Sequence, residues 1–270
     1  MSVLKALIFD VDGTLAETER DGHLVAFNRA FADAGMGWHW SVAHYGVLLA
    51  VTGGKERIAH HWQAVDAAGA AAPGAAEKVR ALHAAKTGHY IELVRSGSVV
   101  LRPGVRRLLI EARARGLRLA IATTTTEANV VELLTATLGS QSLGWFEVIG
   151  AGDAVPHKKP APDIYQWVLD RLRLPAAECL VIEDSAPGVA AARAAGLGTL
   201  LTRSVYSTGE NITGALADLD GLGSHPEHAL GLAPTTDGLR PWSGVVDVAT
   251  LRRWHEVRCS VRGELRSATR

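Results

Sequence analysis

The amino-acid sequence predicts an α/β fold: a doubly wound, Rossmann-like parallel sheet that is interrupted by an inserted helical domain. Three observations support this prediction. Short runs of consecutive apolar residues recur along the chain, as in strands that are buried on both faces of a parallel sheet. Segments with apolar residues at helical spacing separate these runs, which is the alternation found in α/β proteins. One long stretch after the first run has helical patterns and no strand pattern.

The predicted core begins with one short strand and continues as alternating helices and strands. Residues 6–9 form the first apolar run, and a turn follows at Asp10. The later strands are predicted at residues 117–122, 146–151, 179–182 and 197–201, and the helices between them around residues 105–112, 130–138 and 164–172.

The helical stretch divides the chain into two predicted domains. Residues 17–97 are assigned to the insertion, and residues 1–16 together with 98–270 to the core. An Ala-, Gly- and Pro-rich tract at residues 67–76 is interpreted as a turn between two helices of the insertion. The tail is predicted to contain loops at residues 221–226 and 232–241 and a helix over residues 248–257.

Composition and charge limit the possible partners. The 270 residues include 28 Lys and Arg and 28 Asp and Glu, so the formal net charge is zero and there is no bulk positive field for nucleic acid or an anionic membrane. The start of the sequence lacks a signal-peptide pattern, and the apolar runs are too short to span a bilayer. The two cysteines, Cys179 and Cys259, suit a reducing compartment. We expect a cytoplasmic protein that binds a small molecule. The sequence does not decide the oligomeric state of this protein, and a monomer is one possibility.

Two aspartates at the end of the first strand are the first catalytic candidates. Asp10 and Asp12 are two positions apart, so in an extended segment both carboxylates point to the same side. Open α/β sheets bind their ligands at this carboxyl edge. The sequence Asp-x-Asp-Gly is equally typical of an ordinary turn, so this motif alone does not decide between the two interpretations.

Polar residues also follow the next three predicted strands. Four threonines at 123–126 offer hydroxyl and N–H groups at a helix start, where phosphate binds well, although a helix cap is the alternative interpretation. Lys158 and Lys159 come after the third strand, and Glu183 and Asp184 come after the fourth. Each strand end therefore brings a different polar group to the same edge.

Together these motifs resemble those of the haloacid dehalogenase superfamily of phosphotransferases. The resemblance rests on Asp10-Val11-Asp12-Gly13-Thr14, Thr123, Lys159-Pro160 and Glu183-Asp184-Ser185-x-x-Gly188. It implies that Asp10 attacks phosphorus to form an aspartyl-phosphate and that Asp12 is the general acid and base. It also implies that Thr123 and Lys159 hold phosphoryl oxygens.

The same resemblance implies a Mg²⁺ site. The ion would be bound by Asp10, Asp184 and the backbone carbonyl of Asp12, with Glu183 as a ligand through water. A carboxylate that approaches an anionic phosphate is repelled, and Mg²⁺ with Lys159 would cancel that repulsion. The expected reaction is Mg²⁺-dependent hydrolysis of a phosphate monoester.

The insertion occupies the place of the mobile cap in this superfamily, and it is similar to the cap of the CbbY-type sugar-bisphosphate phosphatases. That group is associated with xylulose-1,5-bisphosphate, which is the best candidate substrate. One departure is Leu24, because an arginine is expected after the cap histidine. The similar segments are residues 16–23, 26–28 and 48–57, and residues 244–247 in the tail.

Residues of the predicted cap are the candidates for binding the substrate away from the reacting phosphate. Gly53 and Gly54 allow backbone N–H groups to approach an anion, and Lys55 and Arg57 can hold a second phosphate. Without the resemblance, these charges would be interpreted as the solvated first turn of a helix. Further candidate contacts to the substrate are Glu17 and His23, for sugar hydroxyls, and Thr124.

Other functions remain open. A sugar phosphomutase of the same superfamily, similar to β-phosphoglucomutase, shares the core chemistry; such enzymes place a histidine where this chain has Gly22, unless a one-residue shift brings His23 there. A dehalogenase is disfavoured because it has no use for a general acid at Asp12. A phospho-signalling receiver domain also has acidic residues, a Thr and a Lys at strand ends, but it needs no cap. An inactive binding protein is the remaining alternative.

Overall fold

The core of the protein is a mostly parallel sheet. The computed structural model describes residues 3–225 and 227–268, and the side chains as far as residue 260. Within these residues the sheet has eight strands in the order β3-β2-β1-β4-β5-β6-β7-β8; the first six are parallel, and β7 and β8 are antiparallel. This confirms the predicted fold class. The strands are β1 (Ala6–Phe9), β2 (Arg118–Ala122), β3 (Phe146–Gly150), β4 (Cys179–Glu183), β5 (Gly198–Thr202), β6 (Ala217–Leu219), β7 (Ala229–Thr235) and β8 (Gly238–Gly244).

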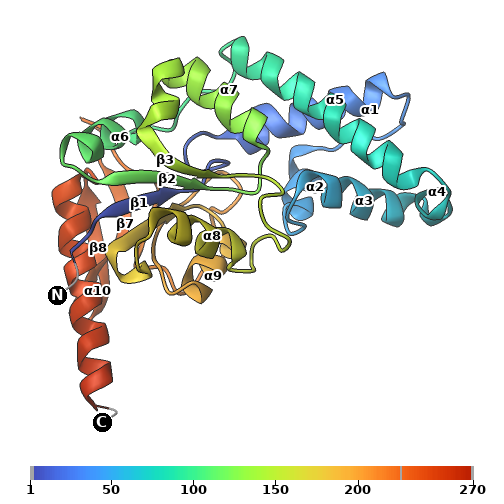
Figure 1. Cartoon of the computed structure of the whole chain (residues 1–270). Helices are drawn as coiled ribbons and strands as arrows, with labels where there is room; N and C mark the ends of the chain where they lie inside the picture. Colours follow the sequence, from blue (N-terminus) through green and yellow to red (C-terminus); the bar gives the residue numbers. More distant parts are fainter. Residues whose placement is uncertain (1–2, 226, 269–270) are drawn as a thin grey trace.

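Helices cover both faces of the sheet (Figure 1). The pleat of β1 turns Leu7 and Phe9 to one face, where they join a core with α6, α7 and α10, and turns Ala6 and Ile8 to the other, with α8 and α9. Both faces of β1 are therefore buried, which explains its continuous apolar sequence. The helices are α6 (Val105–Ala114), α7 (Glu127–Leu138), α8 (Asp163–Leu172), α9 (Ala186–Ala194) and α10 (Val248–Ala268), with short 3₁₀ turns η2 (Ser140–Trp145) and η3 (Ala176–Glu178).

The antiparallel edge of the sheet differs from the sequence prediction. A loop was predicted over residues 232–241, but these residues belong to the hairpin of β7 and β8. The reason is that β8 is an exposed edge strand, so it needs no alternating apolar pattern and tolerates Pro241, which lies opposite Leu232. The loop at 221–225 is confirmed, while residue 226 lies outside the described residues. The predicted terminal helix is confirmed as α10.

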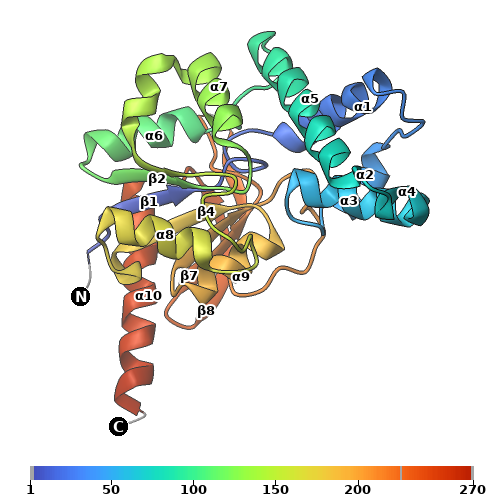
Figure 2. The ribbon, with the colours of Figure 1, turned by 45° about the vertical axis from the view of Figure 1, so that its right-hand side comes forward.

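A block of helices lies beside the carboxyl ends of the strands (Figures 1 and 2). It has its own core, in which Phe27 and Phe31 pack against Trp40, Tyr45 and Trp62. The tract predicted as a turn at residues 67–76 is in part a short helix, α4, because the Asp66 side chain caps it by accepting from the N–H of residue 69. The block consists of the π-helix η1 (Glu19–His23) and of α1 (Leu24–Asp33), α2 (Val42–Leu48), α3 (Gly54–Val65), α4 (Ala67–Ala71) and α5 (Ala75–Arg95).

Among the described residues, no helix combines the length and the apolar character that crossing a bilayer requires.

Candidate active site

Side chains from four neighbouring strands meet at the carboxyl edge of the sheet. Asp10 follows β1, Thr123 follows β2, Lys159 lies on the loop after β3, and Asp184 follows β4. All four side chains are buried. The topology therefore brings together the strand ends that the sequence analysis singled out.

Lys159 is the cation at the centre of this edge. Its Nζ donates to Oδ1 of Asp10 at 2.7 Å and to Oε1 of Glu183 at 2.6 Å. Burial disfavours the charged ammonium group, but the two carboxylates outweigh that effect and raise the pKa of Lys159 well above its ordinary value. Lys159 therefore carries a fixed positive charge directly beside Asp10.

The Glu183 carboxylate is held by the chain that follows it. Its Oε2 accepts hydrogen bonds from the backbone N–H groups of Asp184 and Ser185 at 2.8 and 2.9 Å, and from the Ser185 hydroxyl at 3.0 Å. A Cβ atom at Gly188, in the first turn of α9, would overlap this carboxylate. The glycine of the Glu-Asp-Ser-x-x-Gly motif is thus required by the close approach of Glu183.

We expect Gly188→Ala to destabilise the protein by about 1–3 kcal/mol, the usual cost of overpacking a filled site. Turnover should fall as well, because the added methyl group must push Glu183 away from Lys159. Gly88 is a matched control, because it is helical and no heavy atom lies within 4 Å of the position of an added Cβ. Gly88→Ala should raise the free energy of unfolding by about 0.5–1 kcal/mol. Urea denaturation of both variants measures these changes, and a similar effect of the two substitutions would contradict the steric argument.

Asp10, Glu183 and Asp184 form the acidic cluster that could hold a metal ion within the described part of the chain. One carboxylate oxygen from each lies within 4.8 Å of the other two, and all three residues are buried. Burial and the neighbouring carboxylates raise the pKa of Asp10 to about 8, against the opposing effect of Lys159, and raise that of Asp184 well above its ordinary value. Carboxylate oxygens are the donors that hard divalent cations prefer. The donor set therefore fits such an ion, whose charge would relieve the repulsion.

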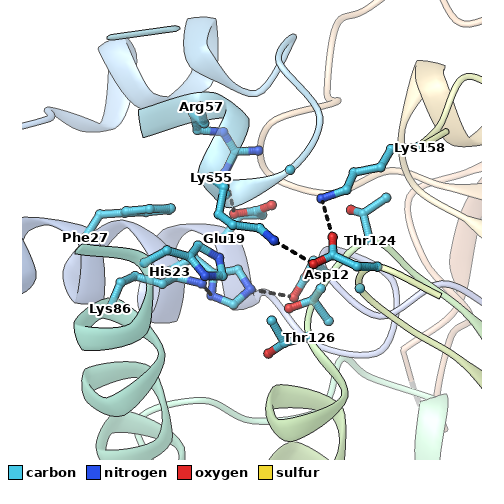
Figure 3. Close-up of a pocket in the computed structure, with 16 residues that line it drawn as sticks. Asp12, Glu19, His23, Phe27, Lys55, Arg57, Lys86, Thr124, Thr126 and Lys158 are labelled. Carbon is cyan, nitrogen blue, oxygen red and sulfur yellow. Dashed lines mark hydrogen bonds and ion pairs between the residues drawn. The ribbon is translucent and has the colours of Figure 1, made fainter. Parts of the chain in front are cut away.

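The Asp12 side chain contacts two residues at the start of the helical block. Its Oδ1 accepts a hydrogen bond of 2.5 Å from Oγ1 of Thr18 and lies 2.9 Å from Nε2 of His23. Nδ1 of His23 lies 2.9 Å from Nζ of Lys86, so the three side chains form a chain of hydrogen bonds (Figure 3). Burial opposes ionisation of Asp12, but His23 and Thr18 outweigh it and hold its pKa at about 2.

A wide helical turn places His23 against Asp12. The segment Glu19–His23 is a π-helix, whose hydrogen bonds span five residues instead of the four of an α-helix. The side chains after it are therefore rotated as if one residue had been inserted into an α-helix. Gly22 faces the Tyr90 ring, where a Cβ atom would lie 2.9 Å from Cε2. Both ring nitrogens of His23 have partners, Asp12 at Nε2 and Lys86 at Nδ1.

A cavity of about 500 Å³ separates the carboxyl edge from the helical block. Asp10 and Lys159 line it from the core, and Glu19 and Arg57 line it from the helices. A narrower cleft continues toward the start of α3 and shares Asp12, Glu19, Arg57 and Thr124 with the larger cavity. Figure 3 shows the side chains around this cleft pointing toward one another from the two sides.

Arg57 is buried, which excludes its interpretation as part of a solvated helical turn. Its Nη1 donates to the Tyr45 hydroxyl at 2.8 Å, and its Nε donates to the carbonyl of Leu48 at 3.2 Å. The Tyr45 hydroxyl in turn donates to Glu19, whose Oε2 lies 3.9 Å from Nη1 of Arg57. These contacts hold the guanidinium group at the wall of both cavities.

The other predicted cap contacts have different positions. Gly54 and Lys55 line the narrow cleft, and Nζ of Lys55 is 2.5 Å from Oδ2 of Asp153. Glu17 lines neither cavity, because it lies on the linker between β1 and the helices and its Oε1 pairs with Nε of Arg102 at 3.3 Å. The carboxylate that reaches the cavity is that of Glu19, two residues later.

Several residues at the cleft were missed by the sequence analysis. Lys86 could have been found, because it interrupts the buried apolar stripe of α5 that includes Val79, Leu82, Tyr90 and Leu93. A lysine at such a position needs a buried partner. Glu19 and Tyr45 carried no such signal, because their roles depend on the packing of η1 against α2.

Comparison with known proteins agrees with this geometry. The family model for haloacid dehalogenase-like hydrolases matches residues 4–196. The chain belongs to this family. Within the haloacid dehalogenase-like hydrolases it is similar to the plasmid-encoded protein CbbY of Cupriavidus necator, with 48% identity over 93% of this chain and 97% of that protein. The protein CbbY of Rhodobacter capsulatus is 53% identical over 78% of this chain and 91% of the relative.

A solved structure has the same architecture. A mutant of CbbY from Rhodobacter sphaeroides, crystallised in complex with xylulose-(1,5)bisphosphate, has a TM-score of 0.74 and 41% sequence identity, over 81% of this chain and 94% of that chain. The present chain is therefore a haloacid dehalogenase-like phosphatase of the CbbY type.

Proposed function

We propose that this enzyme removes one phosphate from a ketopentose bisphosphate, with xylulose-1,5-bisphosphate as the best candidate. The observation that carries the proposal is that Arg57 and Glu19, from the helical block, line the same cavity as Asp10 and Lys159 at the sheet edge. One phosphate can react at the sheet edge while the second meets the cations of α3. The xylulose bisphosphate bound to the similar CbbY of Rhodobacter sphaeroides supports this substrate class.

We further propose that residues 17–97 act as a cap over a core made of residues 1–16 and 98–270. The two linkers between these parts run side by side, since Ala16 and Leu101 form an isolated antiparallel bridge. The ion pair of Glu17 with Arg102 joins the same two linkers. A neighbouring pair of linkers is the arrangement in which one part can move relative to the other. The absence of a spanning helix among the described residues and the free Cys179 and Cys259 support a cytoplasmic location.

In the proposed first step, a carboxylate oxygen of Asp10 attacks phosphorus and the bond from phosphorus to the sugar oxygen breaks. Lys159, 2.7 Å from Asp10, offsets the repulsion between this carboxylate and the phosphate. In this proposal Thr123, which follows β2, donates to a phosphoryl oxygen, and Asp12 gives its proton to the leaving oxygen. A Mg²⁺ ion held by Asp10, Asp184 and the Asp12 carbonyl, with Glu183 through water, would neutralise further negative charge.

In the proposed second step, Asp12 takes a proton from water, which attacks phosphorus, releases phosphate and regenerates Asp10. His23 and Thr18 hold Asp12 as a carboxylate, which is the state that this step requires. A phosphate dianion beside Asp12 raises the pKa of this group, which favours the protonated state needed in the first step. The hydrogen bonds around Asp12 thus suit the base role, and the substrate itself promotes the acid role.

A panel of sugar phosphates tests the proposed substrate class. We expect kcat/KM for xylulose-1,5-bisphosphate to exceed that for the two xylulose monophosphates by roughly 100-fold, because hydrogen bonds to charged groups contribute about 1.5–3 kcal/mol each. Lys55→Gln should reduce this preference for the bisphosphate about tenfold. Lys78→Gln is the control, because Lys78 is exposed on α5 and lines neither cavity. Equal turnover of monophosphates and bisphosphates would remove the role of Lys55 and Arg57.

A sugar phosphomutase is the second candidate, and one observation favours it. By sequence, Gly22 stands where such enzymes have a histidine, but His23, at the end of the π-helix, contacts Asp12. A mutase returns the phosphoryl group to a sugar and depends on a bisphosphorylated activator. If the enzyme isomerises sugar monophosphates and traces of bisphosphate stimulate this reaction, the protein is a mutase. Stoichiometric release of inorganic phosphate instead supports the phosphatase. The receiver domain is not favoured, because the chain belongs to a hydrolase family.

A further inference from the structure

Four charged side chains connect the start of α3 to the core loop that follows β3. We call Lys55, Glu56, Asp153 and Lys158 the charge cluster. Nζ of Lys55 is 2.5 Å from Oδ2 of Asp153, and Nζ of Lys158 is 3.3 Å from Oδ1 of the same carboxylate. Nζ of Lys158 is also 3.1 Å from Oε1 of Glu56. Asp153 thus bridges one ammonium group from the helical block and one from the core.

The two lysines and the aspartate differ in exposure. The side chain of Lys158 is 15% exposed, whereas that of Asp153 is 64% exposed. Lys55 and Lys158 both line the narrow cleft that also contains Thr124 and Arg57. Figure 3 shows that the two lysine side chains reach toward each other from opposite sides of this cleft. The cations therefore face the cleft, and the carboxylate between them has a free path to solvent.

The chemistry of this bridge favours replacement of the carboxylate by a phosphate. A carboxylate offers two oxygens and one negative charge to two ammonium groups, and the hydrogen bond from Lys55 holds the pKa of Asp153 below its ordinary value. A phosphate monoester offers three terminal oxygens and nearly two negative charges, which matches two lysines better. The carboxylate of Asp153 thus occupies the position that suits an incoming phosphate.

We propose that Lys158 shares the distal phosphate of the substrate with Lys55, and that the carboxylate of Asp153 holds these two lysines in place until the phosphate displaces it. This inference rests on the proposed bisphosphate substrate. It adds a specificity residue from the core to a phosphate site that the sequence analysis placed entirely in the cap. The helical block and the core then both contact the distal phosphate. The binding site for this phosphate is therefore complete only when the helical block lies against the core.

The alternative role of the charge cluster is a simple latch that holds the helical block against the core. The two roles predict different directions of change in substrate affinity for the two variants Asp153→Asn and Lys158→Gln. If the cluster is a latch, each substitution removes one ion pair between the helical block and the core, that of Lys55 with Asp153 or that of Glu56 with Lys158. Both variants then change the affinity for substrate in the same direction. If Asp153 competes with phosphate, Asp153→Asn strengthens binding and Lys158→Gln weakens it.

The experiment measures kcat and KM of both variants with xylulose-1,5-bisphosphate and with the two xylulose monophosphates at constant ionic strength. For Lys158→Gln we expect KM for the bisphosphate to rise about tenfold or more, the effect of losing one hydrogen bond to a charged group. For Asp153→Asn we expect the same KM to fall by about two- to fivefold, since an exposed ion pair is weak. Lys158→Arg, which keeps the charge, should retain most of the affinity. Two separate variants, Lys78→Gln and Asp33→Asn, are the matched controls, because each removes one exposed charge of the same sign as Lys158 or Asp153.

The outcomes separate this inference from the proposed function. A bisphosphate KM that changes in the same direction in both variants, or does not change in Lys158→Gln, overturns the role of the charge cluster while the wild-type preference for bisphosphate still stands. A wild-type enzyme without that preference overturns the proposed function and this inference together. If Lys158→Gln does not fold, the sign of the change in Asp153→Asn still decides between competition and a latch.

Discussion

Replacing Asp10 with Asn is expected to abolish turnover and leave the fold intact. The amide of asparagine is not a nucleophile, so the covalent step is lost, and removal of a catalytic nucleophile typically costs on the order of 10⁵–10⁶ in kcat. The side chain keeps its shape and can still accept a hydrogen bond from Lys159, which donates to Asp10 at 2.7 Å. Release of inorganic phosphate from xylulose-1,5-bisphosphate measures the loss.

The stability of this variant provides an independent check. Burial raises the pKa of Asp10 to about 8, which means that the fold disfavours the ionised carboxylate. At neutral pH without metal, this carboxyl group must take up a proton on folding, which lowers the stability of the wild type. Asp10→Asn removes this requirement, so its free energy of unfolding should equal or exceed that of the wild type. Asp33→Asn is the control, because Asp33 is exposed on α1, lies outside both cavities and loses only an ion pair with His89 at the surface, where such pairs contribute little. If Asp10→Asn folded normally and retained more than a few per cent of turnover, the aspartyl-phosphate mechanism would be wrong.

The central strands and the site at their ends could be predicted because their sequence signals are local. Each of these strands is a short apolar run that is followed by a polar residue suited to bind phosphate or metal, such as Asp10 after β1 and Asp184 after β4. The parallel topology then brings these ends together without further information. The hairpin was missed because β8 is an exposed edge strand and β7 buries only Ala229 and Ala233, so neither strand is a continuous buried run.

The part of the site formed by the helical block was harder to predict because it depends on packing between distant segments. The π-helix that turns His23 toward Asp12 differs from an α-helix by one residue, and no local pattern distinguishes the two. Glu17 and Glu19 are two positions apart, and only the packing of η1 against Tyr45 decides which of them faces the cavity. Arg57 was assigned to substrate binding through the resemblance, since its charge alone favours an exposed position.

Removal of divalent ions with EDTA is expected to abolish activity and to lower the melting temperature relative to the protein with Mg²⁺. Three buried carboxylates, those of Asp10, Glu183 and Asp184, lie within 4.8 Å of one another, and a bound cation would offset their repulsion. A ligand at 100 times its Kd stabilises a fold by about 2.7 kcal/mol. For a chain of this size, this corresponds to a rise in Tm of roughly 5–10 °C. Differential scanning calorimetry with EDTA and with Mg²⁺ measures the difference.

The dependence of this metal effect on pH has a definite sign. The fold raises the pKa of Asp10 to about 8 and that of Asp184 well above its ordinary value, so the metal-free native state binds more protons than the unfolded state. The metal-free protein therefore loses stability as the pH rises from about 4 to about 8. Mg²⁺ binds the ionised carboxylates, so the difference in Tm between Mg²⁺ and EDTA should be larger at pH 8 than at pH 5. Asp184→Asn should lose most of this difference, whereas Asp163→Asn, on the first turn of α8 and outside the acidic cluster, should keep it. An equal rise in Tm with Mg²⁺ in both variants would place the ion elsewhere, and the carboxyl edge would then have to balance its charges through Lys159 alone.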